Sequence, residues 1–214
     1  MELTTQQNKV FEQIKAFLNS DASVFILRGY AGTGKTTMVK VIADYIEKNR
    51  KLFMMAPTGR AARVLATKTG HEAVTIHKAI YAKAHVKPKK VKDIAESEFK
   101  FEFPINQFED GGNIVAIVDE ASMVCSRKIE HELFMFGTDN LMEDLLTFVR
   151  PNFDGKVIFV GDPAQLPPVG EPVSNALRAE YFQEKGLKVV EIELTEVIRQ
   201  KGDSAILKLS LIHI

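Results

Sequence analysis

SVFILRGYAGTGKTT, residues 23–37, sets the expected architecture of the chain. An apolar run at 23–28 leads into GYAGTGKT, residues 29–36, which fits the phosphate-loop pattern G-x-x-x-x-G-K-[ST]. Such a loop follows a buried strand and opens a helix, and a helical pattern covers residues 35–48. The alternative is a plain glycine-rich turn, which this context disfavours. We therefore predict a strand, a phosphate-binding loop and a helix in direct succession.

The glycines of this loop indicate how it binds phosphate. Without Cβ atoms in the way, backbone N–H groups curl around phosphate oxygens, and the N-terminus of the next helix adds its positive dipole end. We predict that Lys35 reaches the β- and γ-phosphates of ATP and that the Thr36 hydroxyl holds Mg²⁺. The residues expected to bind the nucleotide are Gly29, Ala31, Gly32, Thr33, Gly34, Lys35, Thr36 and Thr37.

Apolar runs recur along the chain and alternate with helical patterns. The runs lie at residues 51–56, 113–120, 155–162 and 188–194, and the helical patterns lie at 59–68, 126–136 and 140–149. Continuous Val/Ile-rich runs separated by helices indicate a parallel sheet that is buried on both faces. The expected fold class is α/β: a P-loop NTPase domain with a mostly parallel sheet and helices on both faces.

One segment, residues 81–112, breaks this alternation. It opens with the basic run KAHVKPKKVK and continues with EFKFEF, residues 98–103, in which phenylalanines alternate with charged residues. A period of two predicts a half-buried strand. We interpret the segment as a small inserted β subdomain, or hairpin.

An acid pair follows the third apolar run. IVAIVDEASM, residues 114–123, ends a predicted strand in Asp119 and Glu120. In a phosphate-loop enzyme, a carboxylate at the end of a neighbouring strand binds the water shell of Mg²⁺, and a second carboxylate can deprotonate the attacking water. We predict these two roles for Asp119 and Glu120 respectively. The alternative is an acidic pair placed at a helix N-terminus by the helix dipole.

The composition bounds the class of protein. The chain has 214 residues, a formal net charge of +0 and one cysteine, Cys125. A single thiol excludes an intrachain disulfide and fits a reducing, cytoplasmic compartment. The longest purely aliphatic run, IVAIV, is far too short to span a bilayer, so no membrane partner is expected. Net neutrality neither supports nor excludes a nucleic-acid partner, because nucleic-acid-binding surfaces are local.

Several blocks of sequence, taken in order, resemble the motifs of one family. They are LTTQQNKVF (3–11), GYAGTGKTT (29–37), APTGRAARVL (56–65), TIHKAI (75–80), VDEASM (118–123), VGDPAQLPPVG (160–170) and LTEVIRQ (194–200). The family is superfamily 1 DNA helicases of the RecD-like and Dda-like branch, and the resemblance extends over residues 3–208. The blocks GDPAQLPPV and LTEVIRQ are far more specific than the phosphate loop alone.

The resemblance implies roles for residues outside the phosphate loop. Gln7 is implied as the adenine contact, Gln165 as the γ-phosphate sensor, and Arg199 as an arginine that stabilises transition-state charge. With Lys35 and Glu120, the last two form the expected catalytic set. The alternative for Gln7 is an ordinary surface glutamine of the first helix.

Three further residues are implied to lie along single-stranded DNA: Thr58, Arg60 and His77. Hydroxyl groups and cationic side chains bind phosphates without reading the sequence of bases. The alternatives are a solvated helix residue for Arg60 and a core or capping histidine for His77.

The family motor consists of two RecA-like domains with ATP between them. We therefore expect residues 1–80 and 113–208 to form a RecA-like ATP-binding domain and residues 81–112 to form an insertion that helps to split the duplex. We expect residues 209–214 not to be native and the second motor domain to be missing. The alternatives are phenylalanines that only pack the hairpin, and a genuine apolar segment at 209–214.

The resemblance implies an ATP-dependent DNA helicase that moves 5′→3′ on single-stranded DNA, of which this part alone is weak or inactive. Two other functions stay open at this point. One is a stand-alone P-loop ATPase that switches a protein partner without DNA, and the other is a nucleotide-binding fragment without turnover. The sequence leaves open the oligomeric state and the pathway, whether repair, recombination or phage replication.

Overall fold

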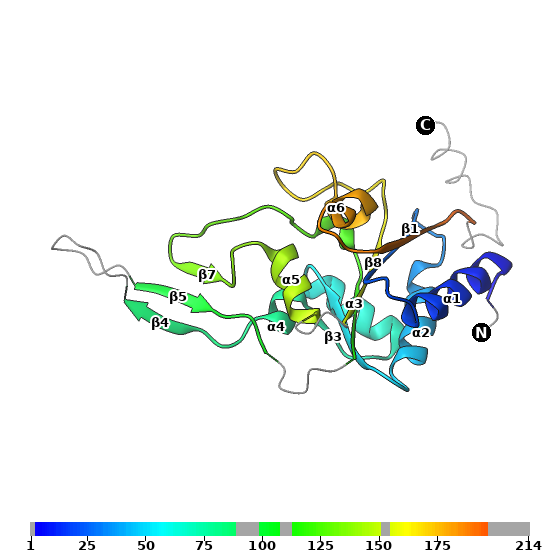
Figure 1. Cartoon of the computed structure of the whole chain (residues 1–214), viewed down its shortest axis with the longest axis horizontal. Helices are drawn as coiled ribbons and strands as arrows, with labels where there is room; N and C mark the ends of the chain where they lie inside the picture. The colour runs from blue at the N-terminus through cyan, green and yellow to red at the C-terminus, as the bar shows by residue number, and fades with distance from the viewer. Residues whose placement is uncertain (1–2, 89–98, 108–112, 151–154, 197–214) are drawn as a thin grey trace.

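A parallel β-sheet forms the centre of the molecule (Figure 1). The computed structural model describes residues 3–88, 99–107, 113–150 and 155–196. Within these residues the main sheet has six strands in the order β3-β2-β6-β8-β1-β9, and each neighbouring pair is parallel. The strands are β1 (Val24–Gly29), β2 (Lys51–Ala56), β3 (Ala73–Thr75), β6 (Ile114–Val118), β8 (Lys156–Gly161) and β9 (Val189–Leu194). The predicted α/β fold with a mostly parallel sheet is confirmed.

Helices cover both faces of this sheet. One face packs against α1 (Thr5–Leu18), α2 (Lys35–Ile46) and α3 (Gly59–Thr69). The other face packs against α4 (Ile76–Ile80), α5 (Leu141–Val149) and α6 (Ala179–Gln183). All residues of β6 and β8 are buried, which explains why these strands are continuous apolar runs without alternation.

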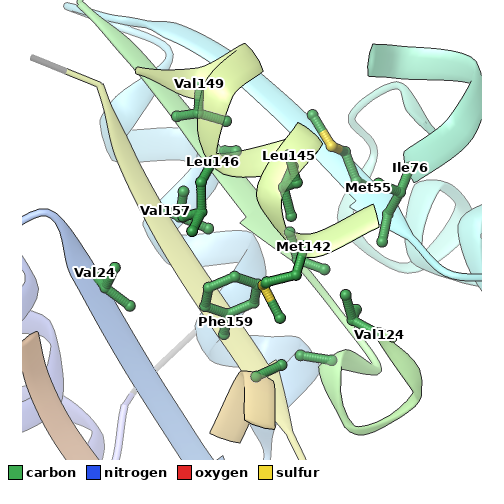
Figure 2. Close-up of a cluster of buried hydrophobic side chains, with 14 of the residues drawn as sticks. Val24, Met55, Ile76, Val124, Met142, Leu145, Leu146, Val149, Val157 and Phe159 are labelled. Carbon is green, nitrogen blue, oxygen red and sulfur yellow. The ribbon is translucent and has the colours of Figure 1, made fainter. Parts of the chain in front are cut away.

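Successive residues of the central strands feed two separate cores. In β8, Val157 and Phe159 belong to the core on the α5 face, whereas Ile158 and Val160 belong to the core on the α2 face. Figure 2 shows the α5 core, in which Met142 and Leu145 of the helix lie over the strands. The sheet therefore has an apolar layer on each side, and the polar loops lie at the ends of its strands.

A second sheet lies beside the first and contains the alternating phenylalanines. Within the described ranges it consists of β4 (His85–Pro88), β5 (Phe99–Phe103) and β7 (Phe134–Phe136). The strands β4 and β5 are antiparallel, and β7 joins β5 in parallel. Figure 1 shows this sheet projecting from the main body. The division at 81–112 stays a prediction, and β7 comes from outside that range.

The predicted helix at 126–136 is wrong. Residues 124–133 have no regular structure, and 134–136 form β7. The rings of Phe136 and Phe103 stack with centroids 4.5 Å apart, and those of Phe134 and Phe101 lie 5.8 Å apart. Cross-strand aromatic pairs of this kind stabilise a sheet, so tertiary pairing overrides the helical pattern. Gly137 and Asp139, both with positive φ, then separate this strand from α5.

A fully buried carboxylate ties the start of the inserted segment to α5. Asp144 accepts hydrogen bonds from the Tyr81 hydroxyl (2.7 Å), the Thr138 hydroxyl (2.7 Å) and the Thr138 backbone N–H (3.1 Å). Burial and the neighbouring Asp144 both raise the pKa of the Tyr81 phenol. A Cβ on Gly137 would come within 2.3 Å of Asp144, so glycine is needed there.

In the described part of the chain, we find no helix with the length and apolar character required to cross a membrane.

We predict that Tyr81→Phe lowers the free energy of unfolding by about 2 kcal/mol, because it removes a hydrogen bond to a buried charged group. Urea unfolding followed by circular dichroism measures this change. Tyr45→Phe is the control, since Tyr45 is a partly buried tyrosine of α2 whose ring packs on Phe11. Equal unfolding midpoints for Tyr81→Phe and the parent would contradict the prediction.

Candidate nucleotide-binding site

The C-terminal ends of β1, β6 and β8 meet at one edge of the sheet, and a cavity opens there. The cavity has a volume of about 580 Å³. It is lined by Thr4, Gln7, Ala31, Gly32, Gly34, Lys35, Thr36, Thr37, Lys40, Lys68, Asp119, Glu120, Asp162 and Gln165. Loops at the carboxyl ends of parallel strands are the usual ligand site of open α/β sheets. The structure thus brings together most of the nucleotide-site residues that the sequence predicts.

The loop after β1 has the backbone shape that its glycines allow. Gly32 and Gly34 have φ values of 87° and 84°, a region that favours glycine. The Thr33 hydroxyl, in a buried residue, donates to the Tyr30 carbonyl at 2.8 Å and closes the turn. Helix α2 then begins at Lys35, so its free N–H groups face the cavity. This is the predicted strand, loop and helix in direct succession.

Lys35 is held across the loop. Its ammonium Nζ donates to the Gly29 carbonyl at 2.5 Å and to the Tyr30 carbonyl at 3.0 Å. The same Nζ lies 3.8 Å from Oδ2 of Asp162, a buried residue that follows β8. The Lys35 ammonium is therefore oriented by two carbonyls of the phosphate loop and by the Asp162 carboxylate, which follows a neighbouring strand.

The acid pair lies at the end of β6, as the sequence predicts. The Asp119 backbone N–H donates to the Met55 carbonyl at 2.9 Å, which continues the pairing of β6 with β2. Burial raises the pKa of Asp119 to about 6; the adjacent Glu120 charge also raises it, and the Lys35 charge lowers it. Glu120 has a φ of 52°, in the left-handed region that is uncommon for residues other than glycine. Strain of this kind is typical of functional sites.

The oxygen ligands at this edge fit a magnesium ion. Thr36 and Asp119 line the same cavity and supply a hydroxyl and a carboxylate. No cluster of three His, Cys, Asp or Glu side chains suited to a metal occurs in the described residues. Mg²⁺ is usually bound through one or two protein groups, with water and phosphate oxygens completing its shell.

Gln7 lies in the first turn of α1, and the Nε2 end of its side-chain amide has no hydrogen-bond partner among the described residues. It is 3% exposed. Its backbone N–H and its Oε1 form a reciprocal capping box with Thr4, at 3.2 and 3.1 Å. Its Nε2 has no hydrogen-bond partner among the described residues, although the side chain lines the cavity. A buried donor without a partner is costly, so this amide is suited to a ligand acceptor. The alternative of a surface glutamine does not fit.

The residues predicted to contact DNA lie outside the cavity lining. Thr58 and the exposed Arg60 begin α3, where the Thr58 hydroxyl accepts from the Ala61 N–H at 3.2 Å as a helix cap. His77 lies on α4, with its ring 5.6 Å from that of Tyr81 and 5.5 Å from that of Phe136. Partial burial lowers the pKa of His77, and the nearby His131 lowers it further.

Two predictions fall outside the described residues. Arg199, predicted to contact the γ-phosphate, and the segment 209–214, predicted not to be native, belong to the part of the chain after residue 196.

Several cavity residues were missed by the sequence reasoning. Asp162 is the clearest case, and its signal was its place directly after the apolar run of β8, the same position that Asp119 has after β6. Lys40 of α2 and Lys68 of α3 also line the cavity. The Lys40 ammonium donates to the Thr69 carbonyl at 3.0 Å. No motif marks these two lysines, because only helix packing brings them to the cavity.

Comparison with known proteins places the chain in a family. A sequence model described as an AAA domain matches residues 2–212. This chain belongs to the AAA domain family. The AAA domain is 30% identical over 209 residues to the ATP-dependent RecD2 DNA helicase of Deinococcus radiodurans, covering 96% of this chain and 23% of that protein. It is 27% identical over 204 residues to the ATP-dependent DNA helicase dda of Enterobacteria phage T4, and the match covers 94% of this chain and 40% of that protein.

Solved structures show the same fold. The AAA domain matches the Pif1 helicase from Bacteroides, determined in complex with ADP-AlF3 and ssDNA, with a TM-score of 0.55 and 22% identity over 99% of this chain and 46% of that chain. The resemblance to RecD-like and Dda-like superfamily 1 helicases is confirmed. The chain spans less than half the length of each of these three relatives.

We predict that Gly34→Ala weakens nucleotide binding by the AAA domain by about five- to thirtyfold, because a Cβ at a φ of 84° costs roughly 1–2 kcal/mol and distorts the loop. Titration with a fluorescent ATP analogue measures the affinity. Gly59→Ala is the matched control: a Cβ there has no neighbour within 4 Å. Equal affinities for the two variants would refute the role given to the loop conformation.

Proposed function

We propose that this AAA domain is the ATP-binding and ATP-hydrolysing half of a DNA helicase that translocates on single-stranded DNA. The observation that carries the proposal is that the phosphate loop, its lysine, the acid pair and Gln165 all line one cavity. The similarity to RecD2 and dda, both described as ATP-dependent DNA helicases, supports the same assignment.

ATP is proposed to lie with its phosphates over the start of α2 and its base towards Gln7. The backbone N–H groups of the loop and the Lys35 ammonium bind the phosphate oxygens. The Nε2 group of Gln7, which has no partner among the described residues, donates to a ring nitrogen of adenine. Both ends of the nucleotide are thereby bound by groups that line the cavity.

Hydrolysis is proposed to use the carboxylates at the end of β6. Thr36 and Asp119 would hold Mg²⁺, which supplies positive charge to the phosphate oxygens when bound. Glu120 accepts a proton from the attacking water, and Lys35 stabilises the charge that develops on the γ-phosphate. Gln165, which lines the same cavity, is proposed to contact the γ-phosphate, and Arg199 is proposed to add a second cation there.

DNA is proposed to run along the edge formed by the start of α3 and by α4. Thr58, Arg60 and His77 offer a hydroxyl and basic side chains without a pattern that reads bases. The small sheet adjoins this edge, because Phe136 of β7 packs against His77. We propose that the β4–β5 insertion helps to split the duplex and that the intact protein moves 5′→3′ with a second motor domain.

We predict that Glu120→Gln keeps ATP binding but lowers the ATPase rate by about 10²–10⁴-fold, because the amide cannot accept the proton of water. The measurements are analogue titration and phosphate release on the same preparation. Lys35→Ala is the matched comparison, since it is expected to lose binding itself. A Glu120→Gln variant that hydrolyses ATP at the parent rate would show that Glu120 is not the base.

We predict that Arg60→Ala weakens binding to oligothymidylate and lowers the slope of log affinity against log salt by about 1, as expected for one lost phosphate contact. Fluorescence anisotropy at several salt concentrations measures both quantities. Arg178→Ala is the control, because Arg178 is also an exposed arginine and lies before α6, on the other face of the sheet from α3, next to Glu180. Matching salt slopes for Arg60→Ala and Arg178→Ala would contradict a DNA contact at Arg60.

The two other candidate functions give different results in one assay. A P-loop ATPase that switches a protein partner hydrolyses ATP at a rate that single-stranded DNA does not change. A nucleotide-binding fragment binds the analogue and shows no turnover under either condition. Stimulation of the ATPase by single-stranded DNA, in the protein with its second motor domain, supports the proposed helicase and excludes both alternatives.

A further inference from the structure

A hydrogen bond joins the loop after β6 to the loop after β8. Ser122 lies two residues beyond Glu120, and its hydroxyl donates to Oε1 of Gln165 at 2.8 Å. Ser122 is fully buried, whereas Gln165 is an exposed residue that lines the nucleotide cavity. Because β6 and β8 are neighbours in the sheet, this contact connects the loop that contains the acid pair to the loop after β8.

Ser122 is fixed by the backbone on which it lies. Glu120, with a φ of 52°, turns the chain into the short 3-10 helix η1 (Ala121–Met123), and the Met123 N–H donates to the Glu120 carbonyl at 3.1 Å. The helix packs closely on Gly161 at the end of β8, where a Cβ would come within 3.2 Å of the Ser122 nitrogen. The packing of η1 on β8 therefore fixes the position of the serine hydroxyl.

Gln165, in contrast, depends on this contact for its side-chain position. The loop after β8 is held by backbone bonds: the Ala164 N–H donates to Oδ1 of Asp162 at 2.9 Å, and the Gln165 N–H donates to the Asp162 carbonyl at 3.2 Å. These bonds place the Gln165 backbone and leave its side chain free to turn. The Ser122 hydroxyl occupies the acceptor end of the amide, so the donor end, Nε2, is the end left for the cavity.

This orientation matters because a phosphate is an acceptor of hydrogen bonds. An amide with Nε2 towards the cavity can donate to a phosphate oxygen, whereas the flipped amide would present its carbonyl oxygen to an anion. We propose that Ser122 is a positioning residue that anchors the Gln165 side chain at the cavity edge, with Oε1 on the serine hydroxyl and Nε2 left to donate. The proposal rests on the proposed ATPase function and adds to it a residue that does not line the nucleotide cavity.

The first test is a double-mutant cycle on the ATPase reaction. Ser122→Ala is expected to lower kcat by about tenfold, the scale of one lost hydrogen bond, with a KM for ATP that changes by less than about twofold. In a Gln165→Ala background the same serine substitution is expected to change kcat no further, since the group that it positions is gone. Independent, multiplying effects of the two substitutions overturn the proposal.

The second test needs no turnover and separates this proposal from the proposed function. The side-chain amide signals of Gln165 in a ¹⁵N-labelled chain, assigned through their loss in Gln165→Ala, report its hydrogen bonding. We expect Ser122→Ala to shift them. We expect Ser23→Ala, which removes the hydroxyl of a buried serine just before β1, to leave them in place. Unshifted signals in Ser122→Ala overturn the positioning role, while absent ATP hydrolysis with shifted signals counts against the proposed function alone.

Discussion

Burial of the parallel sheet on both faces is the constraint on which the rest of the molecule depends. Strands β6 and β8 are fully buried, and their alternate residues enter two cores. Apolar helices must therefore cover each side, and the polar loops can leave only at the strand ends. Since all strand pairs of this sheet are parallel, the loops after β1, β6 and β8 meet at one edge. The nucleotide cavity is a consequence of that topology.

Charge is concentrated where the apolar layers end. Lys35, Asp119, Glu120 and Asp162 each follow a buried strand or its glycine loop within a few residues. Partial removal from water makes their mutual interactions stronger than on an open surface, and it explains the raised pKa of Asp119. The positive φ of Glu120 belongs to the same arrangement, because it turns the chain so that Ser122 meets Gln165 across the cavity edge.

The small sheet is held together by partly exposed aromatic pairs, whereas the central strands of the main sheet are fully buried. Its strands pair through stacked phenylalanines, Phe103 with Phe136 and Phe101 with Phe134, while Phe101 and Phe134 stay 38% and 42% exposed. Asp144 and Tyr81 fasten the start of this unit to α5 through a buried hydrogen bond. An aromatic surface attached to the α4 edge in this way lies close to His77, where the proposed DNA path begins.

Local sequence was sufficient for features that depend on local chemistry. The glycine pattern at 29–36, the apolar runs and the acid pair after β6 predicted the parallel sheet, the loop and the cavity edge, because each needs only a periodicity or a residue type at a fixed spacing. Asp162 was not predicted, although its place directly after the apolar run of β8 marked it. Lys68, the strand β7 and the Ser122–Gln165 bond were not predicted either. Each depends on segments far apart in the chain: β7 forms because Phe134 and Phe136 meet β5, and Ser122 finds Gln165 because β6 lies beside β8. Periodicity describes a single element, whereas such contacts are set by packing between elements.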